Sequence, residues 1–91
     1  MHSILQTRKE SYLSKSEIGL ERHHIFFGSA NRRLSEKYGL WVYLTAEEHR
    51  GTLGVHNDRD LDLYLKRSAQ KKFELSNTRE TFRKIFGKSY L

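Results

Sequence analysis

The sequence predicts a single small α+β domain, with strands in its first half and longer helices in its second. Residues 40–44 are a short, apolar run rich in β-branched and aromatic side chains, which favours a strand. Residues 20–27, ended by Gly28, predict a second strand or hairpin arm. From residue 58 onward, apolar residues recur every three to four positions, which favours helices. A length of 91 residues leaves little room for a second core, so we expect one domain over residues 1–91.

The polar parts of the first half are less regular. Residues 3–6 alternate between apolar and polar side chains and predict a short edge strand. Residues 7–16 are polar and basic, which indicates a surface loop. Residues 29–38 are polar and predict a loop or a short helix, closed by Gly39 as its C-cap.

A helix start follows the second predicted strand directly. Thr45 and Glu48 have the spacing of a capping box, in which each side chain accepts a hydrogen bond from the other residue's backbone N–H. This short helix carries His49 and ends near Gly51, and the loop after it holds His56.

Two further helices are expected at the C-terminal end. In the first, apolar side chains four residues apart share one face. These are Leu61, Leu65, Ala69 and Phe73. The second begins near residue 77 or 78 and ends at Gly87.

The charge balance favours a polyanionic partner. Seventeen Lys and Arg residues against eleven Asp and Glu give a net charge of +6, and each cation placed on a phosphate releases a counterion. A solvated basic face is the alternative interpretation. The candidate nucleic-acid contacts are Arg22, Arg32, Arg33, Lys37 and Arg50.

Several classes of protein are disfavoured by composition. The chain has no cysteine, which excludes disulfides and zinc sites built on thiolates. Its first ten residues carry no apolar run of the signal-peptide type, and no stretch is apolar enough to cross a bilayer. We therefore expect a cytoplasmic location and no membrane partner.

The histidines form the pattern most suggestive of chemistry. His23 and His24 lie together on a predicted strand, and His49 lies on the helix after the next strand. Phosphodiester hydrolysis needs a base to deprotonate water and a cation to neutralise charge on the phosphate. Neighbours on a strand point to opposite faces, so one of the pair could face a metal shared with His49 and the other the attacking water. Spacing alone leaves both assignments open.

The sequence around this pattern resembles a group of phage and prophage HNH-type endonucleases, which belong to the His-Me finger class. The resemblance begins with the run Glu-Arg-His-His-Ile-Phe-Phe-Gly and extends over most of the chain. It covers residues 21–40, 41–51, 54–56, 61–63 and 86–91.

The resemblance implies a ββα-metal core with additional C-terminal helices, and it assigns roles to single residues. His23 would be a metal ligand, His24 the general base and His49 the second ligand, with His56 completing the site. Asn31 would match the catalytic asparagine of the motif. One divalent ion is implied, with Mg²⁺ expected first and Mn²⁺, Ni²⁺ or Zn²⁺ as alternatives.

The sequence departs from this group at the positions of a structural zinc site. Members commonly carry a C-x-x-C pair before the two histidines and a second Cys/His pair at the helix start. Here the positions read Ser11, Ser14, Thr45 and Glu48, and hydroxyls are poor zinc ligands. We therefore expect no structural zinc, with the capping box as another source of order at the helix start.

Together these features predict a phage- or prophage-encoded, metal-dependent endonuclease acting on double-stranded DNA. A monomer would nick one strand, whereas a symmetric homodimer could cut both. Two alternatives stay open: a degenerate HNH scaffold that binds nucleic acid or protein as an accessory or inhibitor, and a nuclease for RNA or branched DNA.

Overall fold

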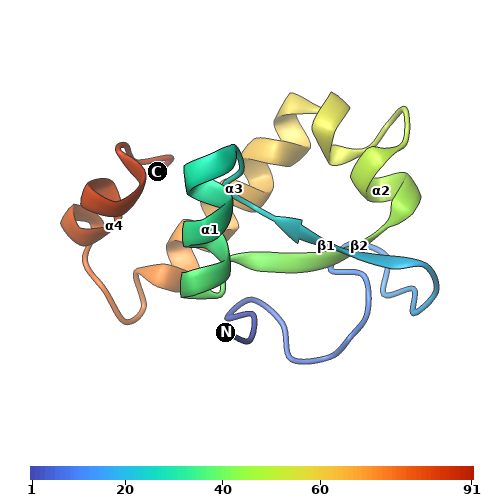
Figure 1. Ribbon diagram of the computed structural model, residues 1–91, viewed down its shortest axis with the longest axis horizontal. Helices are drawn as coiled ribbons and strands as arrows, with labels where there is room; N and C mark the ends of the chain where they lie inside the picture. Colours follow the sequence, from blue (N-terminus) through green and yellow to red (C-terminus); the bar gives the residue numbers. More distant parts are fainter.

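A computed structural model describes residues 1–91 and confirms the α+β class (Figure 1). The fold consists of a two-stranded antiparallel sheet, four α-helices and one 3₁₀ turn. In chain order the elements are β1 (Leu20–His24), α1 (Ser29–Tyr38), β2 (Trp41–Thr45), α2 (Ala46–Arg50), η1 (Val55–Asn57), α3 (Arg59–Phe73) and α4 (Arg79–Phe86). None of the helices combines the length and the apolar character needed to span a bilayer.

The two strands separate neighbouring side chains onto opposite faces of the sheet. β1 pairs with β2 so that His23 lies opposite Val42 and His24 opposite Trp41. Because side chains alternate along a strand, His23 shares its face with Glu21, and His24 lies on the other face. The expectation that the two histidines have different surroundings is therefore confirmed by the register.

The expected edge strand at residues 3–6 is wrong. This segment follows the outer edge of β2 without forming a ladder. The Ile4 N–H donates to the Gly39 carbonyl at 2.9 Å, but the next contact comes from a side chain, in which the Gln6 Oε1 accepts from the Tyr43 N–H at 2.7 Å. Since a side-chain amide replaces a backbone group there, the segment stays irregular.

Residues 29–38, expected as a loop or short helix, form the helix α1. It ends at Gly39, whose φ of +71° favours glycine, and a Cβ there would lie 2.4 Å from the His2 carbonyl oxygen. Ser35, which is fully buried, fixes α1 to the chain that follows β1. Its hydroxyl donates to the Phe26 carbonyl at 2.7 Å and accepts from the Phe26 N–H at 3.0 Å.

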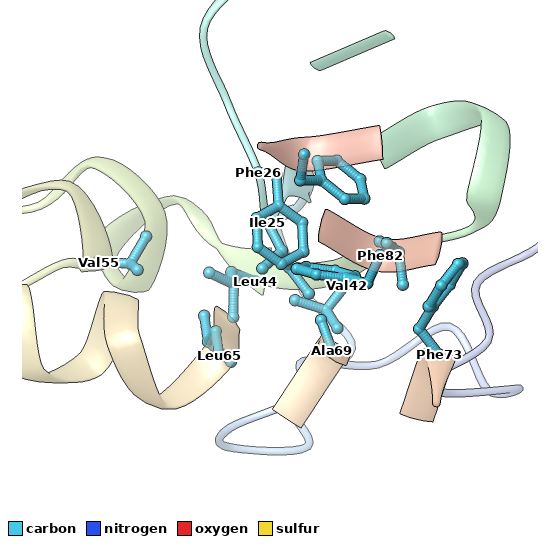
Figure 2. Close-up of a cluster of buried hydrophobic side chains, with 11 residues drawn as sticks. Ile25, Phe26, Val42, Leu44, Val55, Leu65, Ala69, Phe73 and Phe82 are labelled. Atoms are coloured by element: carbon cyan, nitrogen blue, oxygen red, sulfur yellow. The ribbon is translucent and has the colours of Figure 1, made fainter. Parts of the chain in front are cut away.

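The core lies between the sheet and the two C-terminal helices (Figure 2). Leu65, Ala69 and Phe73 of α3 are all buried, which confirms the predicted face with a spacing of four residues. Phe82 and Phe86 of α4 complete the cluster. Figure 1 shows α4 and α2 at opposite ends of the molecule, so the core leaves the α2 end free for the histidines.

Candidate metal centre

Three histidines from three different elements converge at the α2 end of the sheet. They are His23 of β1, His49 of α2 and His56 of η1. Each offers one ring nitrogen, and these nitrogens all lie within 4.8 Å of one another. The ring centroids are 4.9–5.3 Å apart. This cluster can hold a metal ion.

The local sequence explains how His49 and His56 reach His23. The predicted capping box is confirmed, because the Thr45 side chain accepts from the Glu48 N–H while Glu48 accepts from the Thr45 N–H. It starts α2 directly at the end of β2, so His49 falls in its last turn. Gly54 then lets the chain turn back closely, since a Cβ there would lie 2.8 Å from the Glu47 carbonyl oxygen. This close approach sets η1, and with it His56, against α2.

His23 places an unpaired polar atom in the protein interior. Its side chain is 1% exposed, and its Nε2 has no hydrogen-bond partner. Burial, with a smaller contribution from the nearby His49 and His56, lowers the pKa of His23 to about 3. The ring is therefore neutral at physiological pH. A buried nitrogen without a partner is unfavourable, and a bound cation would supply the missing interaction.

His49 is oriented by a carboxylate. Its Nδ1 lies 2.8 Å from the Glu21 Oε1, so its Nε2 is the ring nitrogen left free to bind a metal. Arg50 also binds Glu21, and hydrogen bonds from Arg50 and His49 lower the pKa of Glu21 to about 2. An ionised carboxylate on the far nitrogen of a metal-binding imidazole fixes its tautomer and ring direction. Arg50, expected to contact nucleic acid, is thus engaged in an ion pair within the protein.

On the opposite face of β1, His24 has a different partner. Its Nε2 lies 2.9 Å from the Glu36 Oε1, and its side chain is 13% exposed. Arg22 donates to the same carboxylate at 2.9 Å. The Arg22 guanidinium also lies over the Trp41 ring, 3.7 Å from its centroid.

Residues from both faces of β1 line one hollow of about 230 Å³. It is lined by His23, His24, His49, His56, Phe27, Arg22 and Arg32. A second, wider hollow runs from His24 along α1. Its basic lining residues are Arg32, Arg33 and Lys37, none of which is in an ion pair. Four of the five expected nucleic-acid contacts therefore lie beside the histidines.

Asn31 does not join this arrangement. It lies in the first turn of α1, partly exposed, and its side chain makes no hydrogen bond within the protein. It lines neither of the two hollows. A catalytic role for Asn31 stays a prediction from the resemblance.

The four positions compared with a structural zinc site lie close together and are joined by hydrogen bonds. The Ser11 hydroxyl donates to the Glu48 Oε1 at 2.6 Å and accepts from the Ser14 N–H at 3.0 Å. The Thr45 N–H donates to the same Glu48 oxygen at 2.8 Å. This polar cluster (Ser11, Ser14, Thr45 and Glu48) connects the N-terminal loop to the start of α2.

Two carboxylates at the site were missed at the sequence level. Glu21 stands two residues before His23 on the same strand, so the period of two would have placed them on one face. Glu36 belongs to a different element, twelve residues after His24, and no local pattern joins them. Only the packing of α1 on the sheet reveals that pair.

No family model matches this chain, and no curated protein or solved structure matches it either. The geometry of the histidines and the charges around them therefore carry the functional proposal, and the sequence resemblance stays an expectation.

Proposed function

We propose that this protein is a metal-dependent endonuclease of the His-Me finger class that hydrolyses DNA phosphodiester bonds. The observation that carries the proposal is the hollow in which a metal-competent histidine cluster adjoins a fourth histidine and two arginines. A purely structural metal site needs neither an additional imidazole nor cations at its rim. Phosphodiester hydrolysis needs a base, a cation and contacts to the phosphate.

The donor set bears on the choice of metal. Three neutral imidazoles suit Zn²⁺, Ni²⁺ and related ions, whereas Mg²⁺ prefers oxygen ligands. We therefore propose a transition-metal ion held by His23, His49 and His56, with Mg²⁺ as the alternative that titration tests. When bound, the ion would supply positive charge to the phosphate and to the leaving oxygen.

The other residues have roles that follow from their positions. His24 lines the same hollow and takes the proton from the attacking water. Arg32, which lies at the rim and is in no ion pair, contacts the phosphate under attack, while Arg22 is held by Glu36 beside it. Arg33 and Lys37 of α1 contact the DNA backbone further along the bound DNA strand. The ββα-metal assignment is supported by the order β1, β2, α2, with α1 inserted between the two strands.

The test combines metal titration with cleavage of supercoiled plasmid in Zn²⁺, Ni²⁺, Mn²⁺ or Mg²⁺. We expect His24→Ala to lower the cleavage rate by about 100-fold or more, with metal affinity unchanged in calorimetry. His49→Ala should weaken both metal binding and cleavage. His2→Ala is the matched control, because His2 is exposed and lies outside the hollow.

Two results would contradict this proposal in different ways. If His24→Ala and His49→Ala lost metal equally, the division of roles between them would be wrong. If the folded wild-type protein bound metal without cleaving DNA or RNA, the degenerate binding scaffold would become the better interpretation.

A further inference from the structure

The base proposed above is held by a residue from another element. The His24 Nε2 has one hydrogen-bond partner, the Glu36 Oε1, at 2.9 Å. The contact is partly sheltered, since the His24 side chain is 13% exposed and the Glu36 side chain 39%. Hydrogen bonds from His24, and then from Arg22, lower the pKa of Glu36, so its carboxylate is ionised and acts as an acceptor.

The position of Glu36 is fixed by its neighbour in the sequence. Ser35 is fully buried and makes two hydrogen bonds to the backbone of Phe26, two residues after His24. The Ser35 carbonyl also accepts from the Leu40 N–H at 2.8 Å, where the chain enters β2. α1 is therefore held both to the chain that leaves β1 and to the chain that enters β2, at the same end of the sheet, and Glu36 lies against His24.

We propose that Glu36 is the positioning residue for His24. Its carboxylate accepts the Nε2–H, which fixes the direction of the ring and leaves Nδ1 as the unprotonated nitrogen that receives the proton from water. A carboxylate that holds a histidine base in one tautomer is an arrangement known from hydrolytic triads. This inference rests on the proposed nuclease function.

The competing explanation is that Glu36 merely neutralises Arg22. The two explanations differ in what happens to the His24 tautomer. Glu36→Gln loses the charge that balances Arg22, and its amide NH₂ can donate to the His24 Nε2, so the Nε2–H tautomer is no longer fixed. In Glu36→Ala both the acceptor and the charge are lost.

The first experiment measures plasmid cleavage by the full chain in whichever of Zn²⁺, Ni²⁺, Mn²⁺ and Mg²⁺ gives the fastest wild-type cleavage. We expect Glu36→Ala and Glu36→Gln each to lower kcat by about 10-fold or more, because neither holds the Nε2–H tautomer of His24. KM for DNA should stay level or fall in both variants, because a carboxylate is removed from a basic face. Glu80→Ala, which removes an exposed carboxylate of α4, is the control and should change neither constant.

A double mutant separates action through His24 from action elsewhere. If Glu36 acts through His24, Glu36→Ala combined with His24→Ala should be no slower than His24→Ala alone. A further loss in the double mutant would overturn the proposal. So would wild-type kcat in Glu36→Ala.

A second readout needs no cleavage. In ¹⁵N-labelled protein, the ring nitrogens of His24 should report a single Nε2–H tautomer in the wild type. A mixture of tautomers is expected in Glu36→Ala and in Glu36→Gln, and an unchanged tautomer in both would overturn the positioning role. If the wild-type protein cleaves nothing, the nuclease function fails, whereas this spectrum still decides whether Glu36 orients His24.

Discussion

At the scale of single residues, His23 links metal binding to stability. Its neutral, buried imidazole has no partner for Nε2 within the protein. Without metal, folding has to bury this nitrogen uncompensated, so the metal-free protein carries a cost that a bound ion removes. Stability of the metal-free form should therefore depend on pH through this residue.

The direction follows from the pKa of His23, which burial lowers to about 3 in the folded chain from an ordinary 6.5. Below pH 6.5 the unfolded chain binds a proton that the folded chain does not, so stability is full above 6.5 and is lost toward pH 3. Between pH 7 and pH 5, in a chelator, we expect the wild type to lose about 2 kcal/mol more than His23→Leu. Urea unfolding at both pH values measures the difference.

His2→Ala is the control for this comparison, since it removes an exposed histidine and should keep the wild-type pH dependence. Equal pH dependence in the wild type and His23→Leu would show that His23 is not the group responsible.

At the scale of elements, α2 is a five-residue helix that carries a metal-binding side chain. Helices this short are not stable on their own, so its order comes from the contacts at its start. Glu48 provides most of them, because one carboxylate oxygen accepts from both the Ser11 hydroxyl and the Thr45 N–H. The polar cluster thus orders the helix that positions His49.

We expect Glu48→Ala to lower the free energy of unfolding by about 1–2 kcal/mol and to weaken metal binding as well. Chemical denaturation and calorimetric titration measure the two effects. Glu47→Ala is the matched control, because Glu47 is exposed and its side chain makes no hydrogen bond. Unfolding energies that differed by less than about 0.5 kcal/mol between the two variants would rule out this role for the cluster.

Elements differ in how far the sequence predicts them, for physical reasons. The α2 start and the buried face of α3 depend on local spacing, and both were predicted. Residues 3–6 have a strand-like alternation, but a long-range side-chain contact from Gln6 interrupts their pairing with β2. The separation of His23 from His24 followed from strand geometry, whereas the partnership of His24 with Glu36 depends on the packing of α1, which leaves no periodic signal.

At the scale of the whole molecule, only part of the net charge of +6 comes from cations that are free to bind a polyanion. Arg22 and Arg50 are engaged with Glu36 and Glu21. Arg33 and Lys37 on α1, in contrast, are exposed and in no ion pair, and they line the hollow beside His24. The free positive charge near the histidines is therefore concentrated on α1.

Arg33→Ala should weaken DNA binding and reduce the slope of log K against log salt by about 0.9, the value for one lost phosphate contact. Fluorescence anisotropy over a salt series measures both quantities. Arg83→Ala removes an exposed arginine of α4, which lies outside both hollows, and should leave the slope unchanged. Equal changes in the two variants would indicate binding through net charge rather than through the α1 face.

The irregular segment along β2 has a consequence for how copies of this protein meet one another. A two-stranded sheet leaves backbone groups open along its outer sides, and such rows invite pairing with a strand from another molecule. Residues 3–12 occupy one of these sides, where Gln6 and Tyr12 take the hydrogen bonds of Tyr43. Because the cover is itself irregular, it presents no new ladder outward. The N-terminal loop therefore covers the outer edge of β2 and should disfavour aggregation through pairing of this edge with a strand of another molecule.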